Sequence, residues 1–310
     1  MTTATVYKST GSWYALRDEA GGDWQGRTKG KMRIDGEISS TNPIAVGDTV
    51  VIDIEDEAVR TALIREVAPR NNYMVRLSPH NRNQKHIVAA NLDATVIVAT
   101  IATPRTSQGF IDRFLVTAEV YHIPAIIVFN KADLLDEADE AHLDAWDEMY
   151  TAAGYRVLRV SGLEPETLEP MKALLAGRRT LFSGHSGVGK STLINALIPG
   201  MALRTGEVSD WSGKGQHTTT FAEMHDLPGG GQLIDTPGVK EFGLIDIEKD
   251  ELPEYFPEMR ALLPDCRFHN CKHLEEPGCA VKAALEAETL SPDRYISYVT
   301  MRETIEEKQW

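Results

Sequence analysis

Three nucleotide-binding motifs occur in this chain in an unusual order, and that order strongly constrains the fold of the central domain. Residues 184–191, Gly-His-Ser-Gly-Val-Gly-Lys-Ser, match the phosphate-loop pattern G-x-x-x-x-G-K-[ST]. The tetrapeptide Asn130-Lys-Ala-Asp133 matches a guanine-reading motif, but it precedes the phosphate loop. The metal-contacting motif, Asp235-Thr-Pro-Gly238, comes last. All the parts of a GTP-binding domain are present in rotated order, so we expect a circularly permuted α/β P-loop domain.

The segments on either side of the phosphate loop support this interpretation. Residues 180–183 predict a strand and residues 191–198 a helix that Pro199 stops, which disfavours a chance glycine-rich turn. Glycines let backbone N–H groups approach phosphate, and a helix N-terminus favours an anion. We expect Lys190 to pair with the β- and γ-phosphates and Ser191 to ligate Mg²⁺. The predicted GTP contacts of this segment are Gly184, Ser186, Gly187, Val188, Gly189, Lys190, Ser191 and Thr192.

The guanine-reading motif follows residues 125–129, an apolar run typical of a buried parallel strand. The Asp133 carboxylate can accept hydrogen bonds from N1–H and the exocyclic amine of guanine, and adenine offers neither donor in that arrangement. We expect Asn130 to support the loop and the base edge, and the Lys131 stem to cover the ring. A solvated turn after a strand is the alternative for these four residues taken alone.

Residues 221–235 have a hairpin pattern, in which two strand-like runs flank a Pro-Gly-Gly-Gly turn. Asp235 then lies at a strand tip, where it would anchor Mg²⁺ through the outer coordination sphere, and the Gly238 N–H would sense the γ-phosphate. Many GTPases place a glutamine at the next position to orient the attacking water. Val239 cannot do this, so we expect slow turnover unless another group positions the water.

The Gly- and Ser-rich segment 212–220 is the candidate for supplying that group. It fits a mobile switch, and one of its threonines should meet Mg²⁺ when GTP is bound. We choose Thr219, with a shift of one residue left open. His217 is the candidate to contact the attacking water, and an ordinary loop histidine is the alternative. The candidate catalytic residues are therefore His217, Lys190 and Thr219.

Cysteine and histidine cluster in the C-terminal part. Cys266, Cys271 and Cys279 are all the cysteines of the chain, and His269 and His273 lie between them. Three thiolates and one imidazole form the closed tetrahedral site typical of structural zinc. Buried free cysteines or a redox pair are the alternatives. The odd number of cysteines and the lack of an expected signal peptide argue against disulfides.

The pattern along the chain predicts three parts. Residues 1–88 alternate short β-rich runs with turns, which predicts a five-stranded barrel of the OB type, a fold that binds oligonucleotides. The predicted strands are residues 4–8, 13–17, 31–34, 49–54 and 62–67, and a polar linker is predicted at 71–86. Residues 89–245 predict the α/β GTPase domain. Residues 246–310 predict a mostly helical zinc-binding domain whose last helix starts at Ser291-Pro292.

A formal net charge of −14 is not the composition of a general RNA-binding protein. Basic residues are nevertheless concentrated near the N-terminus, where Arg27, Lys29, Lys31 and Arg33 alternate. A period of two places them on one sheet face, as a stripe suited to phosphate contact. An ordinary solvated strand face is the alternative.

Nothing in the sequence predicts a membrane segment. The N-terminus lacks the apolar core of a signal peptide, and the apolar runs are far shorter than a bilayer span. We therefore expect a soluble, cytoplasmic protein without a membrane partner.

The motif series as a whole resembles the ribosome-small-subunit-dependent GTPase A family over nearly the entire chain. The resemblance implies an OB-fold, a permuted GTPase domain and a zinc domain. It also implies a function in late maturation of the small ribosomal subunit, with rRNA contact and GTP hydrolysis that is slow until the subunit stimulates it. The family spacing C-x4-C-x-H-x5-C makes Cys266, Cys271, His273 and Cys279 the ligands of one zinc ion. We expect a monomer that binds GTP and GDP.

Two positions depart from the family pattern. Gln216 stands where an arginine commonly precedes the switch histidine, which puts a phosphate contact there in doubt. Ser161-Gly162-Leu163 replaces the usual Ser-Ala behind the guanine but leaves a backbone N–H for the base oxygen. Ser161 and Gly162 therefore join the predicted GTP contacts.

Two other function classes stay open beside a GTP hydrolase of ribosome assembly. Val239 keeps open an RNA-binding checkpoint protein that uses GTP and GDP only as a ligand switch. A P-loop small-molecule kinase or ATPase is the third class, and Asp133 argues against it.

Overall fold

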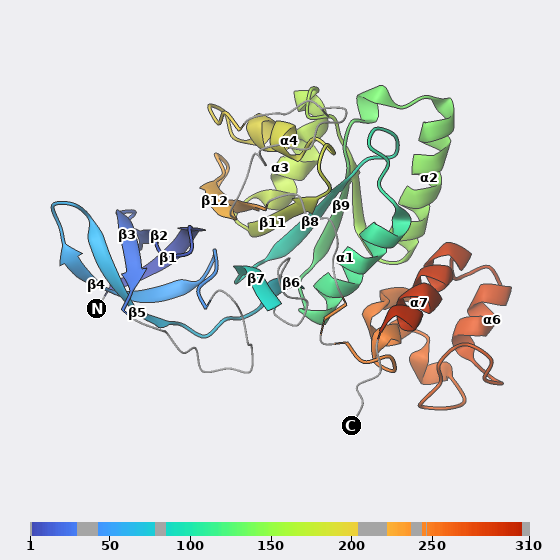
Figure 1. The fold of residues 1–310 in the computed structure, drawn as a ribbon. Coiled ribbons are helices and arrows are strands. Elements are labelled where there is room, and N and C mark those ends of the chain that lie inside the picture. Colours follow the sequence, from blue (N-terminus) through green and yellow to red (C-terminus); the bar gives the residue numbers. More distant parts are fainter. Residues whose placement is uncertain are drawn as a thin grey trace, which may run out of the picture.

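The computed structural model describes residues 2–29, 43–77, 85–203, 222–236, 244–245 and 247–305. Figure 1 shows an N-terminal β-barrel, a central α/β domain and a mostly helical C-terminal part. The predicted fold class is therefore confirmed. Within these described ranges, no helix has the length and apolar character needed to cross a bilayer.

The barrel is a sheet that closes on itself. Its strands are β1 (Thr2–Ser9), β2 (Tyr14–Asp18), β3 (Asp23–Thr28), β4 (Thr49–Asp56) and β5 (Thr61–Val67). β1 pairs with β2 and β4, β2 with β3, β3 with β5, and β5 with β4. Side chains alternate between core and surface, and Val6, Leu16 and Ile52 lie in the core.

Strand β3 is absent from the strands that the sequence predicted, because it has little apolar character. Trp24 and Gly26 are its buried residues, and Trp24 alone supplies a large apolar side chain. A Cβ at Gly26 would lie 2.4 Å from a methyl carbon of Leu16, so glycine is required where β3 crosses the core. The predicted strand at 31–34 lies outside the described residues.

The segment predicted as a polar linker, residues 71–86, contributes instead to a two-stranded antiparallel sheet. β6 (Tyr73–Leu77) pairs with β7 (Lys85–Ala90). Val75 and Ile87 are buried in a small hydrophobic cluster. The linker prediction is wrong for these strands, because polar neighbours conceal a short alternation of apolar residues.

The central sheet is mainly parallel, in the order β10-β9-β8-β11-β13-β12. Its strands are β8 (Ala94–Ala99), β9 (Ala125–Phe129), β10 (Arg156–Arg159), β11 (Arg179–Gly184), β12 (Glu223–Asp226) and β13 (Gln232–Asp235). β12 and β13 pair antiparallel and form the hairpin that the sequence predicted.

Helices cover both faces of this sheet. They are α1 (Gln108–Val120), α2 (Glu137–Ala152), α3 (Glu169–Leu175) and α4 (Lys190–Leu197), with the 3₁₀ helices η1 (Ala132–Leu134) and η2 (Pro165–Leu168). Ile97 and Ile127 pack in the cluster that contains α1 and α2, whereas Val96 and Val128 pack in the cluster that contains α3 and α4. Neighbouring residues of one strand thus face opposite sides, which explains why these strands are apolar throughout.

The barrel and the central sheet are continuous, because β1 pairs antiparallel with β12. Lys8 lies opposite Glu223, and its Nζ is 2.6 Å from a carboxylate oxygen of Glu223. The Tyr7 hydroxyl donates to Asp226 at 2.8 Å. The barrel is thus attached to the strand that directly precedes β13.

The C-terminal part packs against α1. Its elements are η3 (Leu252–Tyr255), α5 (Pro257–Arg260), η4 (Leu263–Asp265), α6 (Ala280–Glu286) and α7 (Pro292–Thr304). Helix α7 starts as predicted, with the Ser291 hydroxyl accepting from the Arg294 N–H. A hydrophobic cluster that includes Phe256 and Tyr298 extends to Val116 of α1.

A buried ion pair joins α7 to α1. Arg294 Nη1 lies 2.5 Å from Asp112 Oδ1, and both side chains are almost completely inaccessible to solvent. Arg294 Nε contacts Glu258 at 2.7 Å, and the Tyr150 hydroxyl donates to Asp112 at 3.0 Å. Such a pair tolerates burial only while each charge keeps its partners.

Replacing Asp112 with alanine would leave Arg294 buried without its α1 partner. We expect the free energy of unfolding to fall by about 3–5 kcal/mol, as measured by urea denaturation. The matched control is Arg65→Ala, which breaks an exposed pair with Asp53 and should cost about 1 kcal/mol or less. Equally small losses in both variants would contradict a structural role for the buried pair.

Candidate functional site

The nucleotide motifs lie at one edge of the central sheet, because they follow the carboxyl ends of its parallel strands. Residues 130–133 follow β9, residues 161–163 follow β10, and the phosphate loop follows β11. Asp235 is the last residue of β13. Open α/β sheets bind ligands at this edge. Segments that are separated in the sequence are therefore brought together here.

The phosphate loop connects β11 to α4. Gly189 has a φ of +85°, in the left-handed region, and a Cβ at this position would lie 2.3 Å from Asn130 Nδ2. Glycine therefore permits the loop to approach the base motif. Helix α4 begins at Lys190, and the N–H groups of its first turn have no partners within the helix. These donors suit a bound anion.

The lysine of the phosphate loop contacts the third motif. Lys190 Nζ lies 3.3 Å from Asp235 Oδ1 and donates to the carbonyl oxygen of Thr236. The Thr236 hydroxyl in turn donates to the carbonyl oxygen of Phe182 in β11 at 2.8 Å. Lys190 and Asp235 are both buried, so each charge stabilises the other.

Asn130 joins the base motif to two neighbouring loops. Its Nδ2 donates to the carbonyl oxygen of Val188 in the phosphate loop at 2.8 Å. Its Oδ1 accepts from the Gly162 N–H at 3.1 Å. A backbone bond from Ala132 N–H to the Val160 carbonyl oxygen adds a second link between the loops after β9 and β10. The Asn130 side chain therefore links the loops that follow β9, β10 and β11.

One expected donor is already engaged. The sequence predicted that segment 161–163 leaves a backbone N–H for the base oxygen, and in the structure the Gly162 N–H donates to Asn130 Oδ1. The Leu163 N–H donates to the Ser161 hydroxyl at 3.2 Å. A base oxygen would have to share the Gly162 N–H with Asn130, because Asn130 Oδ1 already accepts a hydrogen bond from it.

The other two residues of the base motif are placed differently. Lys131 has a φ of +65°, and its Nζ donates to the carbonyl oxygen of Thr103 at 2.7 Å. Asp133 lies in η1 with its residue exposed to solvent. The sequence did not predict a contribution from the loop around Thr103. Its position after β8 could have indicated one, since that strand ends at the same edge.

The remaining nucleotide residues lie outside the described part of the chain. These are His217, Thr219, Gly238 and Val239, together with Gln216. Their roles stay predictions.

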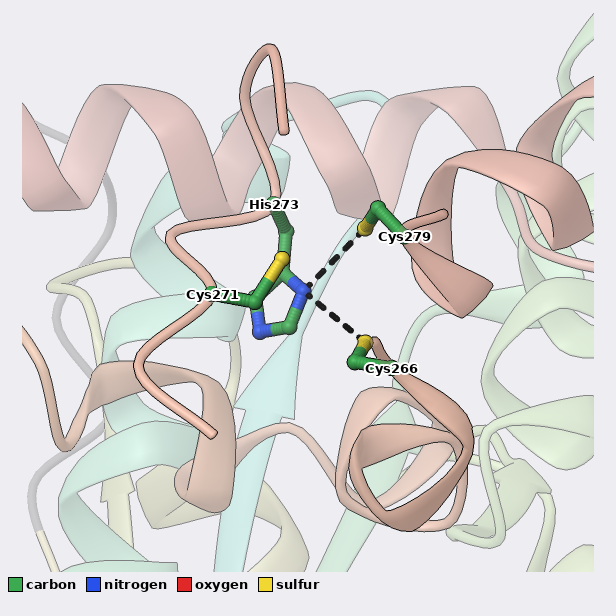
Figure 2. Close-up of side chains that lie close together, drawn as sticks. All are labelled: Cys266, Cys271, His273 and Cys279. Carbon is green, nitrogen blue, oxygen red and sulfur yellow. Dashed lines mark hydrogen bonds between the residues drawn. The ribbon is translucent and has the colours of Figure 1, made fainter. Parts of the chain in front are cut away.

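The cysteine and histidine residues of the C-terminal part converge on one point. Figure 2 shows Cys266, Cys271, His273 and Cys279 with their side chains turned toward one another. Their ligand atoms all lie within 4.8 Å of one another. His273 Nδ1 is 3.3 Å from Cys279 Sγ and 3.7 Å from Cys266 Sγ. The edges of a tetrahedral site with zinc–ligand bonds of ordinary length measure about 3.5–3.8 Å. This group fits a metal ion, and the alternative ligand His269 is exposed and not part of it.

Local contacts hold the metal cluster in shape. Cys279 caps α6 by accepting from the Lys282 N–H, and the Tyr295 hydroxyl donates to the His273 carbonyl oxygen at 2.7 Å. Burial lowers the pKa of His273, which keeps the imidazole neutral and able to bind a metal. Burial and the nearby Cys279 side chain raise the pKa of Cys271 to about 12, so thiolates here need a cation to balance them.

The sheet order, the phosphate loop and the upstream base motif define a P-loop GTPase whose parts are circularly permuted. Family models agree: residues 67–245 match the RsgA GTPase domain and residues 3–60 match the RsgA N-terminal domain. The chain belongs to the RsgA GTPase family, as the motif resemblance predicted.

Relatives and solved structures cover nearly the whole chain. "Small ribosomal subunit biogenesis GTPase RsgA" from Bacteroides fragilis is 48% identical over 98% of this chain and 97% of its own length. The protein of that name from Flavobacterium johnsoniae is 49% identical, over 98% and 94%. The crystal structure of YjeQ from Thermotoga maritima is 32% identical with a TM-score of 0.78, over 97% of both chains. YloQ, described as a circularly permuted GTPase, is 31% identical with a TM-score of 0.73, over 98% and 94%.

Proposed function

We propose that this GTPase acts in late maturation of the small ribosomal subunit, as a cytoplasmic monomer that binds the subunit and its rRNA. The observation that carries the proposal is the junction at Asn130, which holds an upstream base motif against a downstream phosphate loop. That arrangement is the permuted site of a family whose curated relatives are named for small ribosomal subunit biogenesis.

Different residues of the site contact the phosphates and the base of the nucleotide. Lys190 exchanges its contacts with Asp235 and Thr236 for the β- and γ-phosphates, and Asp133 reads the guanine edge. The phosphate contacts are Gly184, Ser186, Gly187, Val188, Gly189, Lys190, Ser191 and Thr192, with Gly238 at the γ-phosphate. The base contacts are Asn130, Lys131, Asp133, Ser161 and Gly162.

Mg²⁺ would be held by oxygen donors of the same segments. Ser191 and Thr219 ligate it in this proposal, and Asp235 holds its water shell. The donor set fits, because hydroxyl and carboxylate oxygens suit this hard cation and Asp235 is buried beside Lys190. When bound, Mg²⁺ neutralises charge that develops on the phosphates.

The attacking water lacks the side chain that usually orients it, because Val239 has no polar group. His217 is the proposed substitute, and it needs a partner to bring it to the γ-phosphate. Turnover is therefore proposed to depend on the ribosomal subunit. A protein that uses GTP and GDP only as ligands would show no such dependence.

The barrel offers a surface for rRNA. A hollow of about 980 Å³ is lined by Arg27, Lys29 and Arg65 together with Asp53 and Glu55. Arg27 contacts Glu55 at 3.0 Å and Arg65 contacts Asp53 at 2.5 Å, so the basic stripe is partly neutralised. Exposed pairs of this kind contribute little to stability, so a phosphate group can replace the carboxylate partner. Lys31 and Arg33 lie outside the described residues.

The cysteine and histidine cluster is proposed to bind one structural zinc ion. Three thiolates and an imidazole suit zinc, and four protein ligands leave no open position for a reactive water. Zinc would then stabilise the loop between η4 and α6 and take no part in hydrolysis.

The purified protein should hydrolyse GTP slowly and discriminate against ATP. Saturating small ribosomal subunits should raise GTP turnover many-fold, because the subunit would order the attacking water, which Val239 cannot do. Large ribosomal subunits should leave the turnover unchanged. Phosphate release assayed with each particle measures this. Turnover that small subunits leave unchanged would favour the checkpoint protein over the hydrolase.

Elemental analysis of the purified protein should find one zinc ion per chain. His273→Ala should lose the zinc and lower the thermal midpoint, because three remaining ligands cannot close the site. His269→Ala is the matched control, since this neighbouring histidine lies outside the cluster. Zinc lost from His269→Ala and retained by His273→Ala would refute the ligand set.

A further inference from the structure

The first side chain of the phosphate loop packs against a helix outside the loop. The rings of His185 and Phe110 are stacked, with centroids 3.6 Å apart and planes inclined by 28°. Phe110 lies in the first turn of α1 and is buried, whereas His185 is half-buried. None of the motifs in the sequence accounts for this contact.

Phe110 is a fixed platform for the histidine. Its N–H donates to the Ser107 hydroxyl that caps α1. Asp112, two residues further on, is held by Arg294 at 2.5 Å and by the Tyr150 hydroxyl at 3.0 Å. The first turn of α1 is thereby held at its cap and from the C-terminal part.

The other contacts of the phosphate loop involve its C-terminal end. Val188 accepts from Asn130, and Lys190 contacts Asp235 and Thr236. Within the described residues, the hydrogen bonds do not include the backbone N–H groups of residues 185–187. Those donors are free for phosphate, and the stacked ring of His185 is the contact that fixes their direction.

We propose that His185 is a positioning residue for GTP, which rests on the phosphate-binding role proposed above. Its stack on Phe110 holds the N–H groups of residues 185–187 in the orientation that binds phosphate. Donors that are already oriented need no reorganisation when the ligand arrives. His185 does not react with the substrate, and its effect reaches the phosphates through the backbone.

The neutral state of the ring agrees with a packing role. Burial lowers the pKa of His185, so the imidazole carries no charge near neutral pH. It therefore adds no positive charge to the phosphate site, and shape and stacking are its contribution.

The test compares His185→Ala with His185→Phe, which keeps an aromatic ring. Competition titrations against a fluorescent GDP analogue would give the affinities for guanosine, GDP and GTP. His185→Ala should weaken GDP and GTP by about 2- to 12-fold, as expected for one aromatic pair. Guanosine, which has no phosphate, should bind unchanged. His185→Phe should restore affinity, and KM for GTP should rise in His185→Ala with kcat unchanged.

The matched control is His142→Ala. His142 of α2 also packs on an aromatic ring, with its centroid 4.7 Å from that of Trp146, but it lies outside the phosphate loop. This variant should bind all three ligands normally. Phe110→Ala should weaken GDP as His185→Ala does, and the double variant should be no weaker than either single one. Thermal midpoints of all variants verify folding.

Three results would overturn the positioning role while leaving the nucleotide site itself intact. The first is wild-type GDP affinity in folded His185→Ala. The second is an equal loss for guanosine and GDP, which would indicate general disruption. The third is additive losses from His185→Ala and Phe110→Ala. Wild-type protein that bound no GDP would refute the nucleotide site itself, and the positioning role with it.

Discussion

The side-chain amide of Asn130 connects loops from three strands of the central sheet. Its Nδ2 donates to Val188 in the phosphate loop, and its Oδ1 accepts from Gly162 behind the base site. Asn130 is 4% exposed, so leaving this amide unsatisfied would cost about 1–3 kcal/mol. The loops therefore hold one another in place. Because these bonds depend on where the strands lie in the sheet and not on chain order, the motifs can be rotated in the sequence and still form one site.

The permuted order also determines where the flanking parts attach. The chain passes through the phosphate loop before it reaches β12 and β13. β12 pairs with β1 of the barrel, and β13 ends at Asp235 beside Lys190. The C-terminal part is attached to a helix, because Arg294 of α7 pairs with Asp112 of α1. Both flanking parts are therefore attached to elements that border the nucleotide site, α1 directly through the stack of Phe110 on His185.

Much of the fold and of the candidate site could be predicted from local sequence patterns. Phosphate-loop glycines, the hairpin before Asp235 and the Ser291-Pro292 helix start each depend on residues close in sequence, and the structure contains all three features. The cysteines and histidines close together in the sequence likewise predicted the metal cluster, and the family resemblance selected His273 over His269. Motif order and the apolar strand at 125–129 predicted a permuted α/β domain. The match to the RsgA N-terminal domain model then accounts for the barrel.

The features that sequence reasoning missed depend on distant partners. Strand β3 is stabilised by its neighbours in the barrel, since Trp24 and Gly26 alone give it little apolar pattern. The pair of Asp112 with Arg294 joins helices from different parts of the chain, and no local pattern relates them. The engagement of the Gly162 N–H by Asn130 could not be predicted either, because it depends on how two loops meet.

The base preference of Asp133→Asn tests most directly whether the upstream motif and the downstream phosphate loop form one guanine site. An amide at this position cannot accept both guanine donors, but it can donate to the additional oxygen of xanthine. We predict that GTP binding weakens and XTP binding strengthens in this variant, as measured by titration with both nucleotides. Unchanged preference for GTP would contradict the assignment of Asp133 and, with it, the account of a permuted site joined through Asn130.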